Sequence, residues 1–252
     1  MRYLGLDIAT TTGWSYFEDE SLVERGSIHI LSQMDLPQRL HYFHLELKRV
    51  LEKMNPEWIF IEDVFLGISG AKTLAYLSRL NGVAINTSFE VLQENVKLYE
   101  PGYWKANSFE GLNGSAKKWQ IQLAAIKHFG ISVTGDFKSI DDKVKLSESE
   151  IELKKLQNSN IRLEINKLKA EMVRKRNPLT EDETKKHKIR IKELEKTCQS
   201  LKESAKKLQK DFDKKMEKAS IDISAQTGMT NDICDSCGVA ICGYNEVIIG
   251  GK

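Results

Sequence analysis

The sequence predicts an α/β fold, a sheet flanked by helices, with an antiparallel α-helical coiled-coil hairpin inserted into it. Over the first 130 residues, short apolar segments alternate with segments of helical periodicity. Between residues 144 and 219, Lys, Glu, Leu and Ile dominate, and Gly and aromatic residues almost disappear. After residue 228 the chain returns to apolar sequence that contains Gly and Cys. These three observations indicate one layered domain that is interrupted by a helical segment.

The elements of the layered domain follow from periodicity and from turn residues. Short apolar runs between turn residues predict strands, and apolar residues three and four apart predict helices. Residues 57–65 are apolar on both faces, as in a central strand that helices cover on each side. We expect Ser115 to begin the last of the early helices and Gly130 to end it. The expected strands are 2–9, 14–18, 27–31, 57–65 and 96–101, and the expected helices are 36–56, 71–85, 115–130 and 230–244.

The inserted segment is expected to form a hairpin of two long helices over residues 141–219, within a domain made of 1–140 and 220–252. Pro178 should break the helix, and Thr180 with Glu183 forms a capping box that restarts it. Each arm would extend on the order of 50 Å. One continuous helix paired with another chain is the alternative, and Pro178 argues against it. The expected seam is Ile161, Ile165, Leu168 and Met172 in the first arm, and Ile191, Leu194, Cys198, Leu201, Ala205, Leu208 and Phe212 in the second.

Charge is distributed unevenly along the chain, although the formal net charge is only +2. Residues 144–219 hold 22 Lys and Arg against 14 Asp and Glu, so the rest of the chain is acidic. The basic segment could be an ordinary solvated coiled coil, an arm that contacts DNA, or a surface that pairs two subunits. The residues near the expected tip that we assign to DNA contact are Arg174, Lys175 and Arg176.

Four acidic residues stand where apolar residues would pack better. Asp7 and Glu62 lie inside expected strands, and Asp232 and Asp235 share one face of the last helix. Each has an ordinary explanation alone, as a turn, strand-end or helix-end residue. Together they need a shared counter-charge, which two Mg²⁺ ions would supply. We expect that Mn²⁺ can substitute for Mg²⁺. Two such ions form the usual clamp for hydrolysis of a phosphodiester.

Four motifs resemble, in order, those of RuvC-type Holliday junction resolvases: LGLDIATTTGWSYF, IFIEDVFLGISGAKTLAYLSRLNGVAI, LNGSAKKWQIQ and DICDSCGVAI. The resemblance implies an RNase H-like mixed sheet and a homodimer that acts on four-way junctions. It implies that the four acids hold magnesium and that Phe65 stacks near the junction. Lys105 and Lys118 would lie near the scissile phosphate, with Lys117 beside them as a further DNA contact. The inserted hairpin departs from the ordinary bacterial enzymes and favours a phage or viral member.

The remaining features restrict the class of protein. Four cysteines form no disulfide framework, and no apolar stretch is long enough for a membrane helix, so we expect a soluble cytoplasmic protein. The leading hypothesis is a magnesium-dependent endonuclease that resolves Holliday junctions and other branched DNA. One alternative is an ATP-dependent kinase of the actin/hexokinase type, with phosphate bound at DIATTTG. The other is a protein that binds branched DNA without cutting it.

Overall fold

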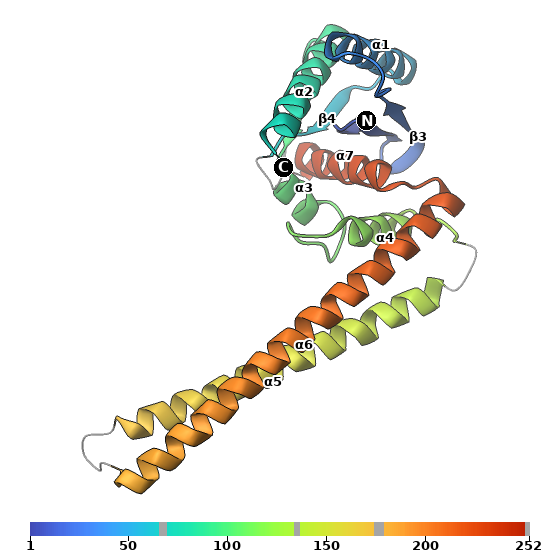
Figure 1. Ribbon diagram of the computed structural model, residues 1–252. Helices are drawn as coiled ribbons and strands as arrows, with labels where there is room; N and C mark the ends of the chain where they lie inside the picture. Colours follow the sequence, from blue (N-terminus) through green and yellow to red (C-terminus); the bar gives the residue numbers. More distant parts are fainter. Residues whose placement is uncertain (66–69, 134–136, 174–178, 250–252) are drawn as a thin grey trace. The chain divides into compact units, whose positions relative to one another are not determined.

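The computed structural model describes residues 1–65, 70–133, 137–173 and 179–249. The chain forms two compact units (Figure 1). The first unit consists of residues 1–133 and 220–252, and the second consists of residues 134–219. None of the described helices combines the length and the apolar character that a membrane span needs.

The first unit is built on a five-stranded mixed sheet in the order β3-β2-β1-β4-β5. The first three strands are antiparallel neighbours, whereas β4 runs parallel to β1 and β5 runs parallel to β4. This is the RNase H-like arrangement that the sequence analysis predicted, and that prediction is confirmed. The strands are β1 (Arg2–Asp7), β2 (Thr11–Glu18), β3 (Ser21–His29), β4 (Trp58–Glu62) and β5 (Val96–Tyr99).

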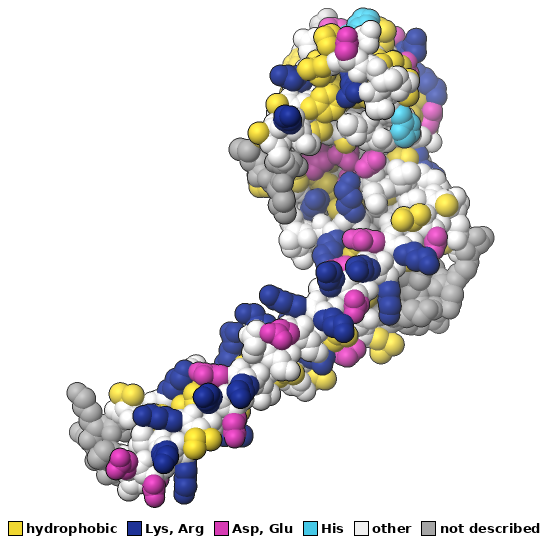
Figure 2. Space-filling model, viewed as in Figure 1, with side chains coloured by type: hydrophobic (Ala, Val, Ile, Leu, Met, Phe, Trp, Pro, Cys, Tyr) yellow, Lys and Arg dark blue, Asp and Glu magenta, His cyan; other side chains and the backbone are white. Residues whose placement is uncertain are grey.

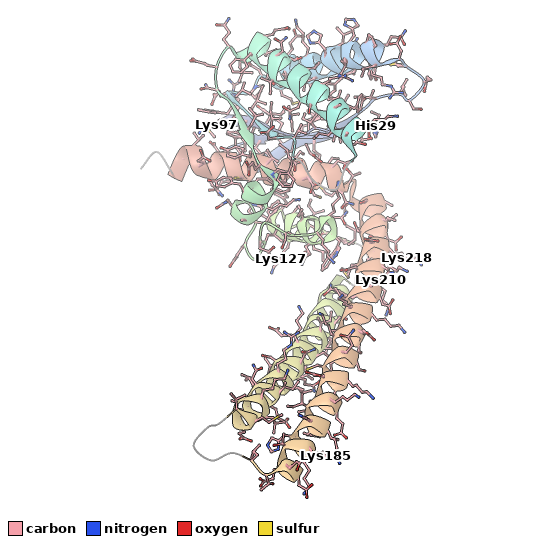
Figure 3. All side chains as sticks on the ribbon, turned by 60° about the vertical axis from the view of Figure 1, so that its left-hand side comes forward. His29, Lys97, Lys127, Lys185, Lys210 and Lys218 are labelled. Atoms are coloured by element: carbon pink, nitrogen blue, oxygen red, sulfur yellow. The ribbon has the colours of Figure 1, made fainter. Side chains whose placement is uncertain are left out.

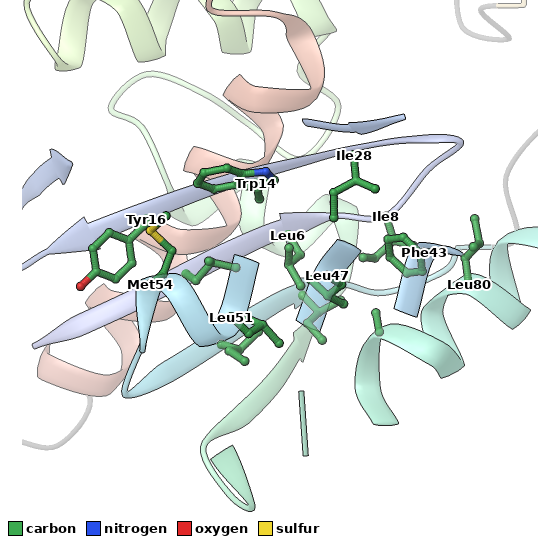
Figure 4. Packing of buried hydrophobic residues seen from close by; sticks show 14 residues of the cluster. Leu6, Ile8, Trp14, Tyr16, Ile28, Phe43, Leu47, Leu51, Met54 and Leu80 are labelled. Atoms are coloured by element: carbon green, nitrogen blue, oxygen red, sulfur yellow. The ribbon is translucent and has the colours of Figure 1, made fainter. Parts of the chain in front are cut away.

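Helices α1 (Leu36–Met54) and α2 (Ala71–Leu92) cover one face of this sheet. Helix α1 begins at a capping box in which Asp35 and Gln38 bond to each other's backbone. It ends at Asn55, whose left-handed conformation allows the chain to leave the helix. The core between these helices and the sheet is mainly apolar (Figure 4), and its central residues are Leu4, Leu6, Ile59, Ile61, Phe43, Leu47, Leu51 and Leu80.

Helix α7 (Asn231–Ile249) packs on the opposite face, where it contacts β1, β2 and β4 (Figure 1). Two glycines allow the approach. A Cβ atom on Gly5 would lie 2.2 Å from the Ser236 carbonyl oxygen, and one on Gly13 would lie 2.1 Å from the Asp232 carbonyl oxygen. The backbone of α7 therefore lies directly against the strands, closer than any side chain on these glycines would permit.

The short helices α3 (Pro101–Asn107) and α4 (Lys118–His128) pack against α7. The sequence analysis did not predict α3. Its expectation that Ser115 begins the next helix was wrong, because α4 starts at Lys118 with Lys117 as its N-cap. The Ser115 hydroxyl instead donates to Asn113 in the preceding turn, at 2.7 Å. Gly130 does follow the helix end in a left-handed conformation, with φ of 59°.

The second unit is a hairpin of the helices α5 (Phe137–Met172) and α6 (Glu181–Thr227). The last turns of α6, from residue 220 onward, belong to the first unit. The described seam of the hairpin includes a buried cluster of Ile165, Ile191 and Leu194, against which Ile161, Leu168, Met172 and Cys198 pack. The predicted capping box is confirmed, since the Thr180 backbone N–H donates to Glu183 at 2.8 Å and the Glu183 N–H donates to the Thr180 hydroxyl at 3.3 Å. Pro178 lies outside the described residues.

Candidate active site

Asp7 and Glu62 stand at the ends of two neighbouring parallel strands. The register pairs Leu6 with Ile61, so the next residue of each strand lies beside the other. Leu6 and Ile61 point into the core beneath α1 and α2. Because side chains alternate along a strand, Asp7 and Glu62 face α7 instead. Asp63 bonds locally, since its carboxylate accepts from the Val64 N–H at 2.7 Å.

The first turns of α7 carry the other two acids to the same end of β1. Gly13 pairs with Asp7 across the ladder, and the Asp232 backbone rests on Gly13. Asp235 lies one turn further along the same helix face. Asp7 is 6% exposed and Asp235 is 4% exposed, whereas 27% of the Asp232 side chain is accessible. The structure thus gathers two buried and two half-buried carboxyl groups from three elements.

The pKa values of the buried acids show that these groups influence one another. Burial raises the pKa of Asp7 well above its usual value, and the neighbouring carboxylates of Glu62 and Asp235 raise it further. Burial likewise raises the pKa of Asp235 to about 7, although the Lys118 charge opposes this shift and Glu62 adds to it. One oxygen of Asp235, Oδ1, is buried and has no hydrogen-bond partner among the described residues. Such an atom is costly to keep unless a ligand or ion binds it.

Lysine side chains supply positive charge at this site. The Lys118 Nζ, at the start of α4, lies 3.4 Å from Asp232 Oδ1 and 3.5 Å from Asp235 Oδ2. Burial opposes the charge of Lys118, but the carboxylates of Asp235, Asp7 and Asp232 raise its pKa above the usual value. Lys105 also acts on the site, because its charge lowers the pKa of Asp235.

Trp104 is a site residue that the sequence analysis missed. It is completely buried, and its indole N–H donates to Glu62 Oε1 at 3.2 Å. The Lys105 Nζ lies 5.4 Å from the centre of the same ring. Gly238 of α7 makes room for this ring, since a Cβ atom there would lie 2.4 Å from it. Trp104 therefore fixes the orientation of Glu62 and joins α3 to α7.

The other predicted contact residues lie at the surface or outside the described chain. Phe65 follows β4 and is 63% exposed. Lys117 is exposed at the start of α4. Arg174, Lys175 and Arg176 lie outside the described residues. The structure therefore brings the four acids together with Lys105 and Lys118 and places Phe65 shortly after Glu62 in the chain.

The donor set fits a hard divalent cation, because it consists of carboxylate oxygens and includes the unpartnered Oδ1 of Asp235. As the side chains stand, no group of three or more His, Cys, Asp or Glu among the described residues is arranged to hold a metal. Lys118 provides the positive charge shared by Asp232 and Asp235.

Known proteins with similar sequences include crossover junction endodeoxyribonucleases named RuvC. The protein from Syntrophomonas wolfei is 27% identical over 143 residues, which cover 52% of this chain and 77% of the relative. The protein from Chloroflexus aggregans is 28% identical over 127 residues, which cover 48% of this chain and 75% of the relative. No family model matches the chain.

Solved structures with a similar fold include RuvC of Thermus thermophilus. It aligns with a TM-score of 0.46 at 20% identity, covering 54% of this chain and 84% of that chain. The same protein in complex with a Holliday junction substrate aligns with a TM-score of 0.47 at 19% identity, covering 54% of this chain and 83% of that chain.

Proposed function

We propose that this distant homologue of the RuvC-type Holliday junction resolvases is a magnesium-dependent endonuclease that cuts four-way and other branched DNA. The observation that supports the proposal most is the convergence of Asp7, Glu62, Asp232 and Asp235 from two strands and one helix, with Lys118 among them. Buried carboxylates that repel one another reduce stability, so a cluster of this kind indicates a function.

The four carboxylates would hold the ions, and the buried Oδ1 of Asp235 offers an oxygen to which no other group in the described part of the chain bonds. Bound Mg²⁺, which Mn²⁺ should replace, would activate the attacking water and stabilise the leaving oxygen.

The chain's own residues position these groups. The hydrogen bond from Trp104 keeps one oxygen of Glu62 in a fixed direction. Lys118 can bind a phosphate oxygen, because more than half of its side chain remains exposed beside the acids. Phe65, exposed a few residues beyond Glu62, would stack on a base next to the branch point.

The proposed enzyme acts as a homodimer. A four-way junction has two-fold symmetry, and a symmetric dimer presents two sites that can cut two strands at equivalent positions.

The test is nicking of a synthetic four-way junction by the full-length chain in Mg²⁺. Asp7→Asn keeps the size of the side chain and removes its charge. We expect this substitution to lower the cleavage rate by more than about 100-fold. Even mutation of residues that only hydrogen-bond to the ligands of a metal site lowers metal affinity or activity by roughly 10- to 100-fold. Asp63→Asn is the matched control, since Asp63 bonds to its own neighbour rather than to the cluster. The Asp63→Asn protein should nick the four-way junction at the wild-type rate.

Cleavage that survives Asp7→Asn would refute the proposal. A wild-type chain that binds the junction without nicking it would identify the non-cutting alternative. Transfer of the γ-phosphate of ATP to an acceptor other than water, with release of ADP, would identify the kinase alternative.

A further inference from the structure

The described ion pairs of the hairpin unit all lie in one zone of it, within the range 164–195. They are Lys169–Glu195, Arg190–Glu164, Arg190–Glu193 and His187–Glu171. In this zone, near the turn of the hairpin, these pairs bring a carboxylate within 4.0 Å of Lys169, Arg190 and His187.

A groove between α5 and α6 forms a second zone. It has a volume of about 420 Å³ and a floor that includes Ile151 and Leu201. Among the described residues no Asp or Glu lines it, and five basic side chains do, namely Lys154, Lys155, Arg162, Lys202 and Lys206. No ion pair joins these five to an acid among the described residues, in contrast to the first zone. We call this feature the basic groove.

The groove lies in a broader basic surface. Figure 2 shows Lys and Arg side chains along the hairpin on the visible face. Lys210 and Lys218, labelled in Figure 3, are exposed further along α6. A second hollow, of about 320 Å³, continues from Arg162 and Lys202 to the Lys169–Glu195 pair. The two hollows therefore meet at Arg162 and Lys202, and the second one reaches the first ion pair of the zone near the turn.

Five like charges in one groove repel one another, which weakens the hairpin. The helices are held together despite this by the apolar seam and by a hydrogen bond from the Asn158 side chain to the Cys198 carbonyl, at 2.9 Å. A polyanion would remove the repulsion. From Lys154 to Arg162, α5 rises by about 12 Å, and duplex DNA carries one phosphate charge per about 1.7 Å of axis. The spacing of charge in the groove suits several consecutive phosphates.

We propose that the basic groove binds the phosphate backbone of DNA, without reading its sequence. The groove presents flexible ammonium groups, which contact phosphates rather than base edges. The choice of DNA among polyanions rests on the proposed nuclease function. The binding itself does not depend on the carboxylate cluster, because every residue of the groove belongs to the hairpin unit.

The experiment measures the affinity of the full-length chain for a labelled four-way junction in EDTA, over a range of salt concentrations. The test variant is Lys154→Gln with Lys202→Gln and Lys206→Gln. Each phosphate contact contributes about 0.9 to the slope of log affinity against log salt. We expect the slope to become shallower by about 2.7 and the affinity at moderate salt to fall about tenfold or more.

A matched control removes the same charge near the turn of the hairpin: Lys169→Gln, Lys185→Gln and Arg190→Gln. Two of these residues are engaged in ion pairs, and Lys185 lies beside Glu181 and Asp182. We expect this variant to keep a slope close to that of the wild type. Circular dichroism should show equal helix content in both variants.

Equal slopes for the two variants would overturn the proposal and would leave the groove available to an acidic protein segment instead. Failure of the nuclease proposal looks different. It would appear as nicking that is absent or survives Asp7→Asn, whereas the difference between the two salt slopes in EDTA would remain.

Discussion

Replacing Gly13 by alanine tests how α7 is placed on the sheet. The added Cβ atom would lie 2.1 Å from the Asp232 carbonyl oxygen and 2.3 Å from the Asp232 carbonyl carbon. Ordinary contacts between heavy atoms are about 3.5 Å, so the start of α7 must retreat by at least about 1 Å. Both atoms belong to backbone, which cannot rotate away as a side chain can. The expected loss in the free energy of unfolding is about 1–3 kcal/mol, the usual cost of overpacking.

The same displacement should affect catalysis if the proposed function holds. Asp232 would move with its backbone, away from Asp7 on the neighbouring strand. A misplacement of about 1 Å costs roughly 100-fold in rate, so nicking of a four-way junction should fall by about that factor.

Urea unfolding followed by tryptophan fluorescence measures the stability effect in the relevant unit. The chain has four tryptophans, and all of them, at positions 14, 58, 104 and 119, belong to the first unit. The control is Gly82→Ala in α2, where an added Cβ meets no atom within 4 Å. It should stabilise the protein by about 0.5–1 kcal/mol, because alanine favours a helix. A Gly13→Ala protein that unfolds at the wild-type urea concentration would refute the close contact between α7 and β2.

Two further predictions concern other contacts. Gln122→Leu removes a buried amide that donates to the Ser224 hydroxyl and the Met229 carbonyl, each at 2.7 Å. It should lower the free energy of unfolding by about 2 kcal/mol in the fluorescence assay, and an unchanged value would show that these bonds contribute nothing. The hydrogen bond that the His187 ring donates to the Glu171 carboxylate raises the pKa of His187. The stabilisation of the hairpin by this pair is therefore complete below the pKa of an unfolded histidine, about 6.5, and is lost as pH rises through the higher folded value. NMR titration should show a lower His187 pKa in Glu171→Gln, and equal values in both proteins would exclude the pair.

The sequence contains enough information to predict that the acids of β1, β4 and α7 share one face. Asp7 and Glu62 interrupt strands that are otherwise apolar, and strand periodicity assigns each to the face opposite Leu6 and Ile61. The helical spacing of Asp232 and Asp235 is equally regular. These placements depend on local periodicity, which is why they could be derived before any tertiary contact was known.

Other features depend on contacts between distant segments and could not be derived in this way. Helix α3 has only seven residues, too few for a periodic pattern, and its importance comes from the burial of Trp104 against Glu62. The resemblance placed Lys118 near the scissile phosphate, but its ion pairs with two acids depend on how α4 docks on α7. Glycine within a strand often indicates close approach of another backbone, and Gly13 could have been recognised from this signal.

The position of α7 after the hairpin has a consequence for synthesis on the ribosome. Tyr3 and Phe60 are strand residues whose rings are covered by α7, through stacking on Tyr244 and contact with Gly243. While the chain emerges, the early strands can pair and the two long helices can form from local contacts, but this side of the sheet stays uncovered until α7 emerges. A nascent chain should therefore need protection from aggregation at this stage. It also lacks two of its four clustered acids, so, if the proposed function holds, cleavage of DNA should begin only when translation of α7 is complete.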